Sequence, residues 1–322
     1  ATWEGVLSTI LAVMSAVVPV FLVAGAAYGV RRAVAFDVRT LSSLNLYLLI
    51  PCLVFSSLSR REIEWGLFAR YAGALAAATF SMLALLYLVA RLRRLEGDQL
   101  SAFLMTQFPN LGNFGLPVVL FAFGQEMLPL AVIVLVCGSF LQNTVGIYLA
   151  QRSRGAVLSA LKGVLKFPMV YAFFLALALQ RLGWRPPEEL SGTSVSEALA
   201  LAFVRGVELL ADASIPAQLL ILGAQLAETR LETGANVFLA CLLRLCVAPL
   251  LAAGAAWSLG LRGLEAGVFV VQVSGPTAVG MAVFGVQFEV KPAFLASVVS
   301  WSFLFSVVTM PVLLYIVLYL TG

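Results

Sequence analysis

The sequence predicts an all-α membrane protein with ten transmembrane helices, and three observations support this fold class. Hydrophobic residues make up 61% of the 322 residues and charged residues only 11%, whereas soluble chains carry roughly 45–50% and about 25%. The mean hydropathy is +1.01. Charged or Gly/Pro-rich breaks divide the chain into ten apolar pieces, most of them near the length of about 20 residues that crosses the hydrocarbon. So large an apolar excess must face lipid, which excludes a soluble enzyme.

The ten predicted spans follow one another with short connections. They are residues 6–30, 41–58, 67–90, 99–123, 127–150, 163–181, 199–227, 236–260, 263–286 and 292–320. The first span exceeds the 7–15 apolar residues typical of a cleavable signal peptide, so we expect it to stay in the membrane.

The longest polar break, residues 182–198, contains paired prolines and small polar residues that indicate a surface linker. We expect residues 1–150 to form a first unit of five spans. A connecting segment over 151–198 includes the sixth span, and a second unit of five spans covers 163–322.

Basic residues in the loops predict the orientation of the chain. The odd-numbered connections hold twelve of the 20 Lys and Arg residues and the even-numbered connections hold five. Because Lys and Arg concentrate in cytoplasmic loops, the odd connections are expected in the cytoplasm. Both termini are then expected on the extracytoplasmic side of the cytoplasmic membrane.

The two halves contain a weak repeat whose landmarks recur in the same order. The matched pairs are Pro19 with Pro168, Pro51 with Pro216, Pro109 with Pro276, and Ser139 with Ser302. Each half has an odd number of spans, so the second half enters the membrane from the opposite side. Inverted repeats with broken helices are typical of secondary transporters, which bind substrate near the middle of the membrane.

The fourth span contains the most disrupted helix, in the sequence QFPNLGNFGLP. Pro109 lacks an N–H group, and Gly112 loosens the chain, so backbone groups become free in the membrane interior. Such groups are tolerated only when they are buried in protein or line a wet cavity. A half-helix beginning here points its N–H groups and its positive dipole end into that cavity, and Asn110 and Asn113 add amide donors. This arrangement attracts anions.

The ninth span carries the matching break in VSGPTAVG, with Ser274, Pro276 and Thr277 at its centre. If the two broken helices cross, Pro109 and Pro276 mark the crossing. In the fifth span, Gln142 and Asn143 form a polar patch that is expected to face the crossing or to join helices by hydrogen bonds.

Ionisable residues inside spans are candidates for coupling or structural roles because a charge at mid-bilayer is unfavourable. Asp212 lies in the seventh span and Arg244 in the eighth. Arg244 stays charged and therefore needs a carboxylate, a backbone carbonyl or a wet cavity. Pairing with Asp212 and contact with substrate are both open. Arg205 and Glu208 are spaced as an ion pair on one helix.

Other residue counts exclude further classes of function. Histidine is absent, which removes imidazole-based catalysis and histidine proton relays. The four cysteines form no CxxC pair, so we expect neither a disulfide framework nor a zinc site. No metal and no cofactor are expected.

These motifs resemble the auxin efflux carrier family, which includes plant PIN-type carriers and bacterial malate and malonate permease-like proteins. The resemblance rests on PNLGNFGLP at 109–117, IPCLVF around Pro51, IPAQLLILG around Pro216, Arg244 with Pro249, and GPTAVG around Pro276.

The resemblance implies ten helices in two inverted five-helix repeats, as in NhaA-type antiporters and bile acid symporters. Spans 1, 2, 6 and 7 form a scaffold, while spans 3–5 and 8–10 form a transport unit that moves like an elevator. It also implies a carboxylate site at Pro109, Asn110, Pro276 and Thr277, and a homodimer, as in the PIN branch. Two departures stand out, namely the short connection at 151–162 and Asn113, where bacterial relatives often carry an apolar or aromatic residue.

Three alternatives to an organic anion carrier differ in what the crossing must contain. A sodium-coupled symporter needs acidic or carbonyl oxygens there, and neither break contains an acid. A proton-coupled carrier needs an acid near the crossing, for which Asp212 is the candidate. A membrane receptor built on the same bundle usually carries an added soluble domain.

Overall fold

In the computed structural model, the described residues form helices connected by short loops. The structure describes residues 3–60, 64–151, 167–187, 189, 194–228 and 231–321. Within these ranges β pairing is limited to a single bridge, between Pro109 and Thr277. The all-helical prediction is therefore confirmed.

The first half of the chain contains long helices interrupted by wider π-helical turns and one 3₁₀ turn. Its elements are α1 (Trp3–Ala33), α2 (Val38–Leu44), η1 (Asn45–Leu49), α3 (Ile50–Ser59), α4 (Trp65–Leu92), α5 (Gly97–Met105), η2 (Leu111–Gly115), α6 (Leu116–Phe123), η3 (Gln125–Met127), α7 (Leu128–Leu141), η4 (Gln142–Gly146) and α8 (Ile147–Ala150).

The second half repeats this mixture of continuous and interrupted helices. Its elements are α10 (Pro168–Arg181), α11 (Val195–Glu228), α12 (Ala235–Leu242), η5 (Leu243–Val247), α13 (Ala248–Ser258), α14 (Gly263–Val273), α15 (Val279–Gln287) and α16 (Pro292–Thr321). The predicted sixth span begins at 163, outside the described residues, and α10 covers the remainder of it.

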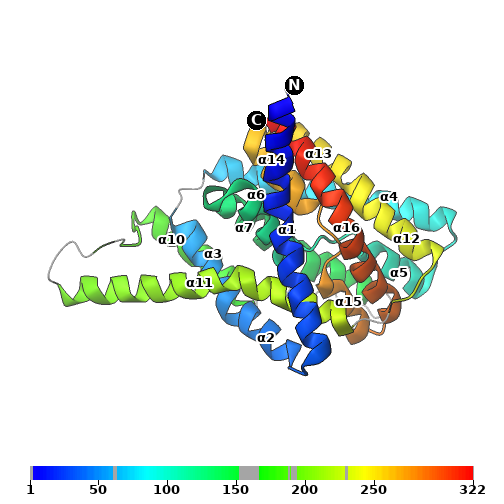
Figure 1. Cartoon of the computed structure of the whole chain (residues 1–322), viewed down its shortest axis with the longest axis horizontal. Helices are drawn as coiled ribbons and strands as arrows, with labels where there is room; N and C mark the ends of the chain where they lie inside the picture. Colours follow the sequence, from blue (N-terminus) through cyan, green and yellow to red (C-terminus); the bar gives the residue numbers. More distant parts are fainter. Residues whose placement is uncertain are drawn as a thin grey trace.

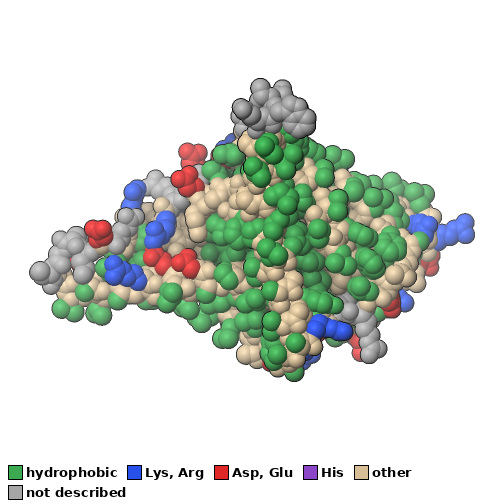
Figure 2. Space-filling model, viewed as in Figure 1, with side chains coloured by type: hydrophobic (Ala, Val, Ile, Leu, Met, Phe, Trp, Pro, Cys, Tyr) green, Lys and Arg blue, Asp and Glu red, His purple; other side chains and the backbone are tan. Residues whose placement is uncertain are grey.

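Six helical segments in the described part of the chain are long and apolar enough to cross a membrane. They are Val6–Ala33, Val38–Ser59, Trp65–Leu92, Gln125–Ala150, Ala235–Ser258 and Pro292–Thr321. Figure 2 shows hydrophobic side chains over most of the visible face, with Lys, Arg, Asp and Glu gathered mainly toward its margins. Large apolar side chains such as Leu22, Leu250 and Val308 are exposed on this exterior. The chain has the surface of an integral membrane protein.

The remaining four predicted spans, the fourth, sixth, seventh and ninth, are not among these six, and the sixth is represented by the short apolar helix α10. The fourth and ninth are broken in the middle, as predicted from their prolines and glycines. The seventh is the 34-residue α11, which carries three ionisable residues in its first half and Pro216 inside it. Figure 1 shows α11 lying across the molecule with its N-terminal part projecting beyond the other helices.

Prolines explain most of the π-helical turns. Three such turns each end two residues before a proline: Asn45–Leu49 before Pro51, Leu111–Gly115 before Pro117, and Leu243–Val247 before Pro249. A proline removes one N–H from the ladder and clashes with the carbonyl four residues earlier. A locally widened turn accommodates that loss and is frequent at functional sites.

The helices pack in two sets that meet at the broken helices. In the first set, α1 packs on α11, and α3 packs on α10 and α11. In the second set, α4 packs on α13, α12 and α15 pack on α16, and α14 packs on α7 and α16. The first set contacts the second through α1 with α6 and α16, and through α11 with η2.

Candidate functional site

The two breaks cross as a short pair of extended segments. The Asn110 N–H donates to the Pro276 carbonyl at 2.8 Å, and the Ala278 N–H donates to the Phe108 carbonyl at 2.8 Å. Pro109 and Thr277 pair in antiparallel fashion between these bonds. Each break therefore satisfies backbone groups that the other break has freed from its helix.

Two helix N-terminal ends meet at a cavity beside this crossing. The helix formed by η2 and α6 begins at Leu111, and α15 begins at Val279. Residues of both first turns line a cavity of about 320 Å³. The first N–H groups of a helix have no partner within the helix, and its dipole is positive at this end. Two positive ends therefore face one cavity.

Amide side chains add to the donors around this cavity, which we call the crossing cavity. Asn110 is only 6% exposed, and its Nδ2 has no hydrogen-bond partner among the described residues. Asn143 Nδ2 donates to the Ser139 carbonyl of its own helix at 2.8 Å. Gln142 Nε2 lies against Gly280, so closely that a Cβ at that position would collide with it. One residue of the cavity lining, Asn110, thus has an unpaired buried donor.

No ionisable group is present among the described residues that line the crossing cavity. Its polar lining residues are Ser42, Asn45, Asn110, Asn113, Ser139, Gln142, Asn143 and Gln225. Apolar residues complete the wall, including Leu46, Ile50, Leu135, Phe167, Ile221 and Phe284. Such a cavity offers helix dipoles and amide groups, and no basic side chain, to a bound group.

Six of the nine predicted binding residues line the crossing cavity, namely Pro109, Asn110, Gly112, Asn113, Gln142 and Asn143. The other three, Ser274, Pro276 and Thr277, are absent from its lining. Thr277 is fully buried, its hydroxyl donates to the Thr106 carbonyl at 2.8 Å, and its N–H donates to Ser302 Oγ at 3.1 Å. Ser274 is buried, and the Pro276 carbonyl accepts the Asn110 N–H. These three residues build the crossing. The lining from this span is provided by Ala278, Val279, Gly280, Val283 and Phe284.

Sequence reasoning missed the polar residues that α11 and η1 bring to this region. Asn45 is buried and lines the crossing cavity, and its Oδ1 accepts from Ser214 Oγ at 3.3 Å. Gln218 Nε2 donates to the same Ser214 hydroxyl at 3.1 Å. The Oε1 of Gln218 faces Gly112, 3.0 Å from the position of an added Cβ. Their occurrence as polar residues inside apolar spans is the sequence signal that could have identified them.

Arg244 lies behind the crossing, where it contacts backbone carbonyls. It is 2% exposed. Its Nε donates to the Gly275 carbonyl at 2.9 Å, its Nη1 donates to the Gln107 carbonyl at 2.8 Å, and its Nη2 donates to the Val273 carbonyl. Of the partners that the sequence allowed, the structure shows backbone carbonyls and no pairing with Asp212.

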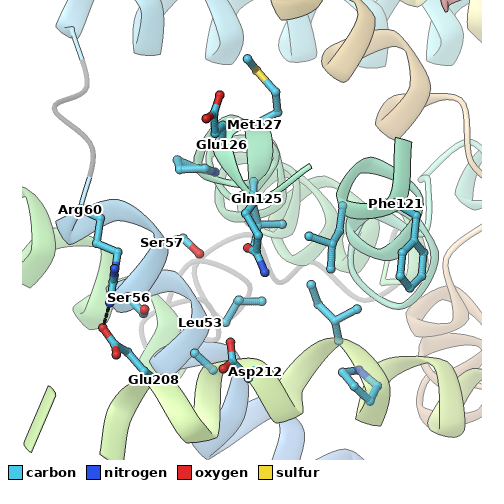
Figure 3. A pocket seen from close by; sticks show the side chains of 16 residues that line it. Leu53, Ser56, Ser57, Arg60, Phe121, Gln125, Glu126, Met127, Glu208 and Asp212 are labelled. Atoms are coloured by element: carbon cyan, nitrogen blue, oxygen red, sulfur yellow. Dashed lines mark hydrogen bonds and ion pairs between the residues drawn. The ribbon is translucent and has the colours of Figure 1, made fainter. Parts of the chain in front are cut away.

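Asp212 lines a second and larger cavity of about 920 Å³ between α3, α11 and the segment from α6 to α7. Figure 3 shows Asp212 and Gln125 pointing into this space, with Arg60 paired to Glu208 at its side. The expected pairing of Glu208 with Arg205 is therefore wrong, because Glu208 reaches across to the end of α3. Asp212 itself is exposed.

The two cavities lie at different positions along the same helices. On α11, residues up to Pro216 line the larger cavity, while Ile221 and Gln225 line the crossing cavity. From η2 to α6, Leu111–Asn113 face one cavity and Leu120 faces the other, roughly 10 Å further along at 1.5 Å per residue. The residues between them include Phe114, Leu116 and Val118, which are fully buried. These buried apolar side chains, which we call the apolar barrier, lie between the two cavities along this segment.

The described residues contain no group of three His, Cys, Asp or Glu side chains placed to hold a metal ion. A membrane protein whose two broken helices cross beside an uncharged cavity has the construction of a membrane transporter.

A sequence profile of the family described as membrane transport protein matches residues 12–314. The chain belongs to this family, and this confirms the resemblance of its motifs to auxin efflux carriers.

Two archaeal proteins are similar to the chain over most of their length. An uncharacterized transporter from Methanothermobacter thermautotrophicus is 27% identical over 284 residues, which cover 85% of this chain and 87% of that protein. An uncharacterized transporter from Methanocaldococcus jannaschii is 25% identical over 267 residues, which cover 80% of this chain and 83% of that protein. The protein is a membrane transporter by family.

Proposed function

We propose that the protein is a secondary carrier of small organic anions and that the crossing cavity binds the anionic group. One observation carries the proposal: two helix N-terminal ends and Asn110, whose buried Nδ2 is unpaired, line a single cavity without an ionisable residue among its described lining. A carboxylate supplies the acceptors and the negative charge that these donors lack. A neutral cavity also releases the anion readily, which a carrier requires.

The size and the wall of the crossing cavity favour a carboxylate with a compact body. Its volume of about 320 Å³ falls at the lower end of small-molecule sites, roughly 300–1,000 Å³. Amides concentrate near the helix ends, while Leu135, Phe167 and Phe284 provide apolar surface. A short dicarboxylate or an aryl acetate satisfies both features.

The proposed mechanism is an elevator-like movement of one helix set against the other. In this proposal the chain has ten spans in two inverted repeats, with a scaffold of α1, α2–α3, α10 and α11. The transport unit comprises α4–α8 and α12–α16. The division of packing contacts into the same two sets supports this proposal, and so does the meeting of both breaks inside the second set.

The proposed orientation places both termini outside the cytoplasmic membrane. The excess of Lys and Arg in the odd connections supports it. In Figure 1, α1 begins and α16 ends at the same end of the molecule, as an even number of spans requires. A homodimer is part of the same proposal and rests on the family resemblance.

The coupling ion has two alternatives, sodium and a proton carried by Asp212. Neither is favoured by the crossing cavity, because no acid is present among its described lining residues. Asp212 faces the larger cavity on the other side of the apolar barrier. We therefore propose anion transport without a bound metal cation or a carboxylate relay at the site.

Replacement of Asn110 tests the site directly. The variant Asn110→Asp keeps the shape of the side chain but replaces the free donor with a negative charge. Anion binding is expected to weaken more than with Asn110→Ala, for which the loss of a hydrogen bond to a charged group predicts about 1.5–3 kcal/mol, roughly 10- to 100-fold.

The measurement is uptake of radiolabelled malate and indole acetate into proteoliposomes, together with the ligand-induced rise in unfolding temperature. Asn236→Ala is the matched control, since the Asn236 side chain accepts hydrogen bonds from Arg93 and Asn236 lies outside the crossing cavity. Unchanged uptake by Asn110→Asp would exclude the crossing cavity as the substrate site.

A further inference from the structure

Arg244 is the feature that the proposed anion site leaves unexplained. Its guanidinium is fully buried in the second helix set and donates to three backbone carbonyls, those of Gln107, Val273 and Gly275. The ion pairs found among the described residues, Arg31 with Glu228 and Arg60 with Glu208, do not involve it. A buried cation is thus held by carbonyl oxygens alone.

The three carbonyls share one structural origin, which is the C-terminal ends of the two broken half-helices. Gln107 follows the end of α5, Val273 is the last residue of α14, and Gly275 lies in the break that follows. The last carbonyls of a helix have no donor within the helix, and the dipole is negative there. Two negative ends therefore converge on a single guanidinium.

Carbonyl oxygens in this position are the usual ligands of a coupling cation. In carriers with broken helices, half-helix C-terminal ends and unwound backbone carbonyls coordinate Na⁺ or take part in proton coupling. Here the equivalent oxygens are bonded to the Arg244 side chain, which comes from the π-helical turn η5 of a different span. A guanidinium carries a permanent charge and is not exchanged during transport.

We propose that Arg244 is a built-in counter-cation, a positioning residue that occupies the place of a coupling cation behind the crossing. Its charge neutralises the carbonyl ends of both half-helices and holds the two breaks together. The N-terminal ends on the opposite face keep their positive potential for the anion. Transport then proceeds without Na⁺. This last consequence rests on the proposed anion transport, whereas the structural role of the charge is independent of it.

Chemical rescue tests the structural role without any substrate. The variant Arg244→Ala leaves a cavity bounded by unpaired carbonyls, and the unfolding temperature of the purified full chain is expected to fall by roughly 5–10 °C. Guanidinium at low, non-denaturing concentration, or Na⁺, should restore part of this loss relative to N-methylglucamine at equal ionic strength. The wild-type protein should show no such response.

Two controls separate a cation site from a general packing defect. Ser274→Ala removes a buried hydroxyl beside the same carbonyls without removing charge, so its unfolding temperature should be insensitive to small cations. Arg244→Lys keeps the charge with fewer donors and should fold if Arg244→Ala does not. Uptake by this lysine variant should remain independent of a sodium gradient.

Two results would overturn the proposal. One is an Arg244→Ala protein that none of the small cations stabilises more than N-methylglucamine does. The other is a wild-type protein whose anion binding requires Na⁺. Because the rescue experiment measures only unfolding, its failure is distinguishable from a failure of the proposed substrate site, which appears in the Asn110 variants.

Discussion

The two faces of the helix crossing are built from the same two breaks but have opposite chemistry. On one face, the N-terminal ends at Leu111 and Val279 line an open cavity with amide side chains and no ionisable residue among the described lining. On the other face, the C-terminal ends at Gln107 and Val273 are closed by the buried Arg244. In the proposed function the N-terminal ends bind a ligand, whereas the carbonyls at the C-terminal ends are satisfied by Arg244 inside the protein.

In the proposed function, this difference between the two faces makes the crossing selective for the charge of its ligand. Breaking a helix frees both N–H and C=O groups, and both are unfavourable in the membrane interior. A fixed cation on the acceptor side removes the attraction for a mobile cation there. The donor side keeps its positive ends, which favours an anion.

The largest effect is expected from a substitution that overpacks the backbone shared by both faces of the crossing. A Cβ on Gly115 would lie 2.8 Å from Gln272 Cγ and 3.3 Å from the Asn110 carbonyl. The variant Gly115→Val should destabilise the fold by about 1–3 kcal/mol through overpacking and abolish uptake. Thermal unfolding and proteoliposome uptake measure the two effects.

Gly25→Val is the matched control for that experiment. Gly25 is exposed on α1, and an added Cβ there meets nothing within 4 Å. Equal destabilisation by both valine variants would show that the crossing has no special packing constraint.

A smaller and more specific effect is expected when a charge is added only to the face of the crossing that carries the helix N-terminal ends. Gln142→Glu places a carboxylate in the crossing cavity near Gly280. Repulsion between charges several ångströms apart predicts a roughly 10- to 100-fold rise in KM for anion uptake at pH 7, with the fold retained.

The defect of Gln142→Glu should depend on pH. Protonation removes the added charge, so uptake should recover as the pH falls toward the ordinary carboxyl pKa of about 4.3. Gln99→Glu, an exposed position on α5 outside the crossing cavity, should behave as wild type. A defect that persists unchanged at low pH would indicate a steric cause rather than repulsion.

The smallest effect is expected when a charge that lies on neither face of the crossing is removed. Asp212 is exposed and lines the larger cavity beyond the apolar barrier. The variant Asp212→Asn should therefore change anion uptake and its pH dependence by less than about twofold. Asp98→Asn, in the first turn of α5, is the surface control. If Asp212→Asn alone abolishes the response of uptake to a pH gradient, proton coupling through this residue is established. Transport would then not depend on the two faces of the crossing alone.

The positions of the helix breaks were predictable because proline and glycine act locally. Pro109 and Pro276 have no N–H to donate, and each is next to a polar residue and within three positions of a glycine. Pro19, Pro216 and Pro311, by contrast, lie inside continuous helices. The same local argument accounts for the π-helical turns before Pro51, Pro117 and Pro249, although their wider geometry was not anticipated. Asn110 and Asn113, which the sequence places at the start of a new helix after the break, line the crossing cavity.

The partners of long side chains were less predictable because they depend on contacts between distant segments. Arg244 is more than 130 positions from Gln107, yet the crossing brings the two together. Glu208 pairs with Arg60, 148 positions away, although Arg205 is its neighbour on the same helix. Thr277 has the residue type of a ligand-binding group, but its hydroxyl is used by the Thr106 carbonyl.

The sequence by itself determined that this chain is helical, that it lies in a membrane and where its helices break. These properties follow from composition and from local backbone chemistry, which neighbouring residues decide. The tertiary structure alone decided which freed groups are satisfied and which remain free. That outcome depends on where Arg244 and the amides of distant spans lie relative to the two breaks. The partner of a backbone group at the crossing is set by three-dimensional proximity, which the local sequence pattern does not encode.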